Sequence, residues 1–389
     1  MKFPKSRREF LITSGIIATA GCTSSSNNNE ENTTSSNNSP ENNTEPSSTE
    51  PTQYNRKWTS SEAVISIDHF DNNVYASASR KLFSLDLGTG DQNWSKNTEY
   101  ASEKFLIATD SYLITPDTIR NRTDGSIRWR GNDRFSEVFE PRLVADNALY
   151  AITSNTGPRS RNLTKLDLKE GSTQWEAPYA FGVTSSDYGI HLMQPGDKYK
   201  LITKDSTNGE NKYSRDFSSD SSLIGSTNDT IVGAENTNSK SSLFGLDAET
   251  GEQLWRKELQ QGFPVTGSRG RKSYVLTENA FYYPVWVRQD GKFFVQSRSL
   301  QNGELKWEKS ISLNLVEFSV GMTKINEAVF FGKIGQGGSK TVLFNSDSGK
   351  NISGDNNMNV MPLSSSDSNL LGIVLVGGEY RLAMFEPAV

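Results

Sequence analysis

The chain has 389 residues and a mass of 43.1 kDa, with 34% hydrophobic and 22% charged residues and a net charge of −5 at neutral pH. The negative charge and the lack of a basic stripe exclude a nucleic-acid-binding surface, because such a partner requires clustered Lys and Arg side chains. A single cysteine excludes a disulfide framework within the chain.

Residues 1–21 predict an export signal. Residues 6–11 read SRREFL and match the twin-arginine pattern through Arg7, Arg8 and Phe10. The apolar stretch that follows is about a dozen residues long, too short for a bilayer core that needs ~20 residues. Twin-arginine export carries folded cargo, which suits a protein that forms no internal disulfide.

Residues 22–53 predict a lipidated cysteine followed by a disordered tether. Residues 19–22 read TAGC and resemble a lipobox, although Thr19 stands where leucine is usual. From this resemblance we expect Cys22 to carry two acyl chains, which would give stable membrane attachment where one chain is marginal. The alternative is an ordinary cleaved signal. Residues 23–53 contain no aliphatic or aromatic side chain and cannot build a core. As flexible coil they would reach ~30 Å.

Residues 54–389 repeat one motif of strand, tight turn and strand. The clearest copies are 82–94, LFSLDLGTGDQNW, and 243–255, LFGLDAETGEQLW. Alternating apolar positions predict a strand buried on one face. The D-x-x-T-G segment predicts a tight turn, because Gly tolerates positive φ and Asp bonds nearby backbone. The motif copies end at Trp58, Trp94, Trp129, Trp175, Trp255 and Trp307, with Tyr213 and Ile352 at two further positions.

The repeat spacing predicts the architecture. From Trp58 to Ile352 the end points are on average 42 residues apart, the length of one four-stranded propeller blade. The segment around Trp58 has no inner strands before it, and the strands expected at 370–376 and 380–385 have no closing Trp after them. The sequence therefore predicts an all-β, eight-bladed propeller in which the N-terminal strand completes the last blade, with seven blades as the alternative.

In these motifs the chain resembles the PQQ-like (quinoprotein-type) β-propeller repeat family over the whole of residues 54–389. The resemblance implies that the Trp side chains pack between adjacent blades and that Trp58 closes the ring. Tyr213 and Ile352 depart from the pattern, which predicts looser packing between blades at those two places.

The resemblance also suggests a quinone-dependent dehydrogenase, but the residues that such enzymes use are missing. The family's enzymes carry an adjacent cysteine pair and a calcium set of Glu, Asn and Asp in motifs that this chain does not show. Its two histidines, His69 and His191, lack a carboxylate or cysteine at ligand spacing. No hydrolase, Walker or metalloprotease motif is present. We therefore assign no catalytic residue, metal or cofactor.

The sixth unit is the longest, with 52 residues between Trp255 and Trp307. It contains Arg269, Arg271 and Trp286, and Arg and aromatic side chains are favoured at protein interfaces. Long loops on a rigid scaffold often carry function, so these residues are the candidate partner surface. The alternative is that the alternating Phe281, Tyr283 and Val285 are simply the core face of a strand and that the basic loop is merely solvated.

These observations predict a monomeric protein that is exported by the twin-arginine route and anchored by lipid on the outer face of the cell membrane. There it would act as a binding or scaffolding module for a protein partner that the sequence does not identify. One alternative is a propeller lipoprotein that assists outer-membrane protein assembly. Another is a small-ligand sensor or enzyme that uses the central channel.

Overall fold

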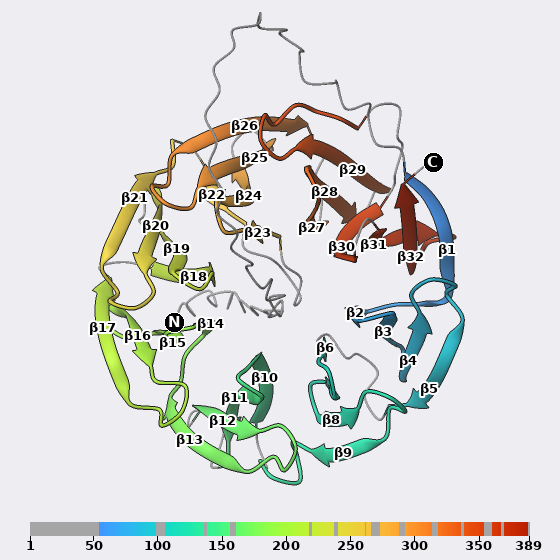
Figure 1. The fold of residues 1–389 in the computed structure, drawn as a ribbon, viewed down its shortest axis with the longest axis horizontal. Coiled ribbons are helices and arrows are strands. Elements are labelled where there is room, and N and C mark those ends of the chain that lie inside the picture. The colour runs from blue at the N-terminus through green and yellow to red at the C-terminus, as the bar shows by residue number, and fades with distance from the viewer. Residues whose placement is uncertain are drawn as a thin grey trace, which may run out of the picture.

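The computed structural model describes residues 54–387, apart from 99–105, 136–137, 156–160, 218–219, 237–239, 261, 266–272, 288–291, 313–317, 336–337, 354–359 and 367–368. Every regular element in these ranges is a strand, and the strands form eight small sheets arranged in a ring (Figure 1). The all-β class and the count of eight blades are thereby confirmed, and the seven-bladed alternative is wrong. In the same ranges no helix long and apolar enough to cross a membrane occurs.

The first four complete blades follow one another along the chain. They are β2 (Ser66–Phe70), β3 (Asn73–Ala78), β4 (Lys81–Asp86) and β5 (Gln92–Asn97); β6 (Ile107–Ala108), β7 (Tyr112–Ile114), β8 (Thr118–Asn121) and β9 (Ile127–Arg130); β10 (Val138–Ala145), β11 (Ala148–Ser154), β12 (Asn162–Asp167) and β13 (Thr173–Pro178); and β14 (Gly182–Ser186), β15 (Gly189–Gln194), β16 (Tyr199–Lys204) and β17 (Asn211–Phe217).

The remaining four blades include the two irregular ones and the closing one. They are β18 (Asp220–Ser226), β19 (Thr230–Asn236), β20 (Ser241–Asp247) and β21 (Gln253–Glu258); β22 (Phe263–Pro264), β23 (Val275–Leu276), β24 (Ala280–Val287), β25 (Lys292–Ser299) and β26 (Leu305–Ser312); β27 (Phe318–Ile325), β28 (Ala328–Gly335) and β29 (Gly338–Asn345); and β30 (Val360–Ser366), β31 (Asn369–Val376) and β32 (Glu379–Pro387) with β1 (Tyr54–Ala63).

Most blades are antiparallel meanders that start beside the central axis and end at the rim (Figure 1). The exceptions are the three-stranded sheet β27–β29 and the closing blade, whose outermost strand is β1. In the first complete blade, for example, β2 is innermost and β5 is outermost. The alternating strand direction divides the loops between two faces of the ring. One face, here called the turn face, carries the turns between the third and fourth strands. The opposite face, the connection face, carries the links from one blade to the next.

The two ends of the chain meet in one blade. Strand β1 is antiparallel to β32, with Tyr54 opposite Pro387 and Trp58 opposite Met384. Figure 1 shows β1 in blue along the outside of the dark red β32. The Ser60 hydroxyl also accepts a hydrogen bond from the Leu382 backbone N–H at 3.1 Å. The predicted closure by the N-terminal strand is therefore confirmed, and it leaves β32 without a free edge.

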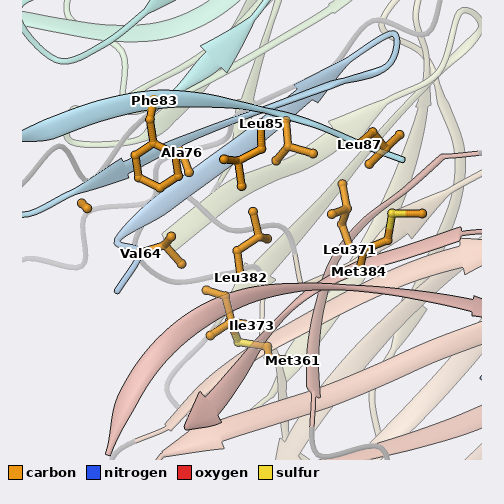
Figure 2. Close-up of a cluster of buried hydrophobic side chains, with 12 residues drawn as sticks. Val64, Ala76, Phe83, Leu85, Leu87, Met361, Leu371, Ile373, Leu382 and Met384 are labelled. Carbon is orange, nitrogen blue, oxygen red and sulfur yellow. The ribbon is translucent and has the colours of Figure 1, made fainter. Parts of the chain in front are cut away.

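The core lies in the layers between neighbouring blades. Figure 2 shows the layer beside the closing blade, where Phe83 and Leu85 of β4 lie across from Ile373 of β31 and Leu382 of β32. All four side chains are at most 5% exposed. Because each blade buries its apolar faces only against its neighbours, this contact between the first and last parts of the chain completes the stack.

The repeated turn has the chemistry that its residues predict. In the turn after β20, the Gly251 N–H donates to the Asp247 carbonyl at 2.9 Å, and Asp247 Oδ1 accepts from the Thr250 N–H at 2.8 Å. Gly251 has a φ of +72°, a conformation that a residue with a Cβ adopts only with strain. The Asp side chain and the Gly backbone thus fix the turn together.

Two contrasting glycines allow the role of these turns to be tested. Gly303 has a φ of +68°, and a Cβ there would lie 2.5 Å from Trp255 of the preceding blade. Gly377 has a similar φ of +61° but no atom within 4 Å of such a Cβ. We expect Gly377→Ala to lower the free energy of unfolding by about 1–2 kcal/mol through backbone strain. Gly303→Ala should lower it by about 2–5 kcal/mol, because the indole must also shift.

Urea unfolding of the two variants and the wild type measures both effects. Equal destabilisation by the two substitutions would show that contact between the turn and the preceding blade contributes nothing.

Candidate functional site

The rim of the ring is held by a repeated contact between an indole and the next blade's turn. Trp255 donates its indole N–H to the Leu300 carbonyl at 2.7 Å, and Gly303 of the same turn lies against its ring. The pattern recurs for Trp58 to Leu87 at 2.9 Å, Trp129 to Leu168 at 3.0 Å, Trp175 to Ser206 at 3.3 Å and Trp307 to Ser346 at 2.8 Å. Trp94 also lies against a turn glycine, Gly125. These Trp residues therefore lie between blades, where a large ring and a paired N–H are both accommodated.

Tyr213 makes the same kind of contact, although it is only partly buried. Its hydroxyl donates to the Ala248 carbonyl at 2.9 Å, and a Cβ on Gly251 would lie 2.3 Å from its ring. A tyrosine hydroxyl can therefore reach the carbonyl that an indole N–H reaches elsewhere.

Ile352 departs from the pattern for a topological reason. The blade that follows it consists of β30–β32 and β1, so its third and fourth strands come from opposite ends of the chain and no turn joins them. Ile352 packs instead with Tyr54 and Phe330, whose rings meet edge to face at 5.2 Å. Within the described residues its own segment pairs with β29 only through a bridge between Phe344 and Asn351.

The innermost strands around the axis are β2, β6, β10, β14, β18, β22 with β23, β27 and β30 (Figure 1). The sequence did not identify them. Buried polar groups tie some of them together: Asp68 of β2 accepts a hydrogen bond from the Ala108 N–H of β6 at 2.7 Å. Asp68 is 6% exposed, so its carboxylate serves the contact between two blades and not the solvent.

The innermost strand of the sixth blade in chain order is interrupted. Its first part, β22, places Phe263 opposite Trp286 of β24, and its second part, β23, places Val275 opposite Tyr282. Between these two parts only Tyr283 and Pro284 of β24 are left to be paired, but the chain has ten residues there, 265–274. This insertion explains the length of the unit. The length came from an extra segment in the strand nearest the axis and not from a longer loop at the rim.

The described ends of the insertion are pinned together. The hydroxyl of the fully buried Ser273 donates to the Val265 carbonyl. Next to this neck, Phe263 is 37% exposed and meets the half-buried Trp286 edge to face at 5.4 Å. Arg269 and Arg271 lie outside the described residues. Of the predicted partner surface, the structure therefore places Trp286 and adds Phe263, which no sequence signal singled out.

In the described part of the protein we identify one group of polar side chains that resembles a catalytic triad in outline. It is centred on the buried His191. His191 Nε2 lies 2.8 Å from Ser186 Oγ, and its Nδ1 lies 2.8 Å from Thr203 Oγ1. Burial lowers the pKa of His191 to about 3, and the nearby Lys212 charge acts in the same direction. A base with this pKa takes up no proton at neutral pH. The three residues therefore tie β14, β15 and β16 together.

The other histidine and the donor set do not fit a quinone cofactor with its calcium ion. Burial lowers the pKa of His69, which lies on β2. Within the described ranges no three His, Cys, Asp or Glu side chains come together as a metal site. The only cysteine precedes residue 54, so the ring contains no cysteine pair. The export residues Arg7, Arg8 and Phe10 and the lipidation residue Cys22 lie outside the described residues.

Comparisons with known proteins agree with this geometry. A family model described as outer membrane protein assembly factor BamB matches residues 162–356. No curated protein matches the sequence.

Among solved structures, the C-terminal WD40 domain of Sif2 is 10% identical, covers 86% of this chain and 99% of its own, and has a TM-score of 0.60. A quinohemoprotein alcohol dehydrogenase from Comamonas testosteroni is 10% identical over 86% of this chain and 76% of its own, with a TM-score of 0.57. BamB from Moraxella catarrhalis is 14% identical over 82% and 83% of the two chains, with a TM-score of 0.42. At 10% identity the likeness to the first two structures is one of fold alone, and that fold is shared by an alcohol dehydrogenase and a WD40 domain.

The low pKa of His191 predicts how stability depends on pH. The unfolded chain binds a proton at this residue below about pH 6.5, whereas the folded protein binds it only near pH 3. The stability that the neutral His191 provides is therefore fully present above pH 6.5 and is lost as the pH falls towards 3. Between pH 6 and pH 4 we expect the wild type to lose about 2–3 kcal/mol more than His191→Gln.

Urea unfolding of both proteins across this range measures the difference. Parallel curves for the two proteins would contradict the assignment, whatever the absolute stability of His191→Gln.

Proposed function

Because the chain belongs to the PQQ-like β-propeller repeat family, whose matching model is described as outer membrane protein assembly factor BamB, we propose that it is a protein-binding module held by lipid on the outer face of the cell membrane. The proposal has three parts, which are the rigid ring, the binding surface and the anchor. The monomeric ring would present the surface, and the anchor would keep it near the membrane.

The ring supplies a rigid support. Indole hydrogen bonds tie five rim strands to the turn of the next blade, and β1 closes the last blade on β32. A support of this kind lowers the entropy that is lost on binding, because the loops it carries are already held in place.

The observation that carries the binding role is the interrupted strand of the sixth blade. Phe263 and Trp286 lie where β22 begins and β24 ends, at the connection face and at the innermost side of the blade. Exposed and half-buried aromatic side chains beside a pinned insertion suit a protein partner, because Trp and other aromatic residues contribute strongly to interface cores. Arg269 and Arg271 of the insertion would add charged contacts to the same surface.

The anchor and tether complete the proposal. Cys22, after a twin-arginine signal with Arg7 and Arg8, would carry two acyl chains, and residues 23–53 would join it to the ring. A flexible tether with a reach of ~30 Å keeps the ring close to the membrane and raises the local concentration of partners there.

The second candidate function is assistance in outer-membrane protein assembly, which the description of the family model favours. It differs from the first in its partner and membrane and not in its mode of action. A small-ligand sensor or an enzyme that uses the channel is a third candidate, and a quinone-dependent dehydrogenase is disfavoured because the donor set does not fit.

The partner surface predicts the effect of truncating its aromatic residues. We expect Phe263→Ala combined with Trp286→Ala to reduce the partner recovered by in-cell crosslinking and affinity capture by roughly tenfold or more, since loss of interface aromatic residues costs ~2 kcal/mol or more. Leu305→Ala is the matched control, because Leu305 is 47% exposed but lies on the rim strand β26. Equal recovery by the double variant and the control would place the partner surface elsewhere.

The anchor predicts a change in fractionation. Cys22→Ser removes the thiol that would receive the lipid, so we expect the protein to move from the membrane fraction to the soluble exported fraction. Immunoblotting of the fractions measures this change, with Ser24→Ala in the tether as the control. Retention of Cys22→Ser in a carbonate-washed membrane pellet would argue against a lipid anchor.

A further inference from the structure

We call the contact between the rim strand of one blade and the turn of the next blade a seam. The seam between the blade β2–β5 and the blade β6–β9 differs from the other seams. At the other Trp seams the turn glycine lies against the ring-fusion atom Cδ2, as Gly90 does with Trp58. At this seam Gly125 lies instead against the outer edge of Trp94, where a Cβ would be 2.6 Å from Cζ3. The indole N–H of Trp94 also has no hydrogen-bond acceptor among the described residues, so the pyrrole side of the ring is withdrawn from the turn.

The same three side chains form a closed seam elsewhere in the ring. In the blade β2–β5, Tyr75, Ser84 and Trp94 are consecutive cross-strand neighbours. In the sixth blade, Tyr282, Ser297 and Trp307 occupy the same register on β24, β25 and β26. There the Trp307 indole and the Tyr282 hydroxyl both donate to one carbonyl, that of Ser346, at 2.8 and 3.4 Å. The identity of these three residues therefore does not explain the difference.

The difference lies in the residue that the next blade contributes. Arg122 occupies the position that Ser346 occupies at the closed seam, directly after the first residue of the turn. Its Nη1 lies 3.5 Å from the Tyr75 hydroxyl and 3.3 Å from Asp71 Oδ2, and its Nε donates to the Asp110 carbonyl at 2.7 Å. The equivalent residues at the other seams are Leu87, Leu168, Ser206, Ala248 and Leu300, none of which is charged. Arg122 thus binds the hydroxyl of Tyr75, whereas the equivalent hydroxyl of Tyr282 donates to the turn carbonyl at the closed seam.

A cavity of about 220 Å³ lies at this seam, lined by Trp94 and Arg122 together with Asn73, Asn93 and Thr123 and by Tyr75 and Ser84. It is smaller than the ~300–1,000 Å³ of sites for drug-sized ligands, so its ligand has to be small. The cavity is on the turn face near the rim. It is therefore separate from both the axis and the surface around Trp286.

The lining offers hydrogen-bond donors and acceptors together. Trp94 Nε1, Asn73 Nδ2 and Arg122 Nη2 are donors without an acceptor among the described residues. Asn93 Oδ1 and Thr123 Oγ1, which belong to exposed side chains, are acceptors without a donor among the described residues. Because Asp71 is paired with Arg122, an anion would meet a neutralised guanidinium and acceptors that it cannot satisfy. A hydroxyl group both donates and accepts, so it matches both kinds of lining atom.

We propose that this cavity binds a single neutral sugar ring, as a free monosaccharide or as the terminal unit of a glycan. Trp94, Asn73 and Arg122 donate to its hydroxyl oxygens, and Asn93 and Thr123 accept from its hydroxyl groups. A ligand of this size, with about a dozen non-hydrogen atoms, binds with a dissociation constant on the order of 1 mM. The site is independent of the protein-binding surface proposed above.

The test is a titration of the full chain followed through the indole N–H signals in two-dimensional NMR, with the Trp94 signal assigned from Trp94→Phe. The ligands are the methyl α-pyranosides of glucose, galactose and mannose, added to about 50 mM, well above the expected dissociation constant of ~1 mM. We expect at least one of them to shift the Trp94 signal saturably. Trisaccharides of the active sugar then distinguish the sources: binding as tight as that of the pyranoside identifies a terminal glycan unit, and loss of binding identifies a free monosaccharide.

Arg122→Ser tests the cause of the open seam. We expect it to weaken sugar binding at least tenfold and to move the Trp94 indole proton downfield in the absence of sugar, because the indole can then reach the carbonyl of residue 122 as Trp307 reaches that of Ser346. Ser346→Arg at the matched seam should leave the sugar response of Trp94 unchanged. The proposal is overturned if no pyranoside shifts the Trp94 signal, if tetrahydropyran or acetate shifts it as much, or if Arg122→Ser binds sugar as the wild type does.

Discussion

The ring depends on one hydrogen bond repeated at its rim, from an aromatic side chain of one blade to a backbone carbonyl in the next blade's turn. At a buried seam an unpaired donor costs about 1–3 kcal/mol, so the position admits a side chain that is both large and able to donate. Trp255 and Trp307 satisfy the carbonyl with an indole, and Tyr213 satisfies it with a hydroxyl. The turn glycine opposite the ring leaves the room that this contact requires.

Closure of the ring imposes the second constraint. A radial array of sheets has two free edges unless its ends pair, and here β1 and β32 pair. The same arrangement removes the turn between the third and fourth strands of the closing blade. Ile352 faces that missing turn, and a residue that packs without donating is sufficient there. The aliphatic residue at this position thus follows from the pairing of β1 with β32 in the closing blade.

The regular scaffold makes its departures informative. Two places lack contacts that other blades make. One is the interrupted strand next to Phe263, and the other is the seam where Arg122 lies beside Tyr75. Neither departure strengthens the ring, so both are places where function can have shaped the residues. One presents aromatic side chains at the connection face, and the other gathers hydrogen-bonding groups around an open hollow at the turn face. The buried His191, in contrast, has both ring nitrogens within 2.8 Å of hydroxyl groups and fits a role in packing.

Local patterns in the chain were enough to predict the outer strands of the blades, the turns, the eight blades and the closing role of the Trp58 strand, because alternation and turn chemistry act over a few residues and recur on average every 42 residues. They also singled out the sixth unit by its length. They could not show that its extra residues interrupt the innermost strand, since that depends on which residues of β24 the two halves face. Likewise Tyr75, Ser84 and Trp94 have the same residue types as Tyr282, Ser297 and Trp307, and only the neighbouring blade distinguishes the open seam from the closed one. These particular contacts join residues of different blades, and the local pattern of one blade does not determine them.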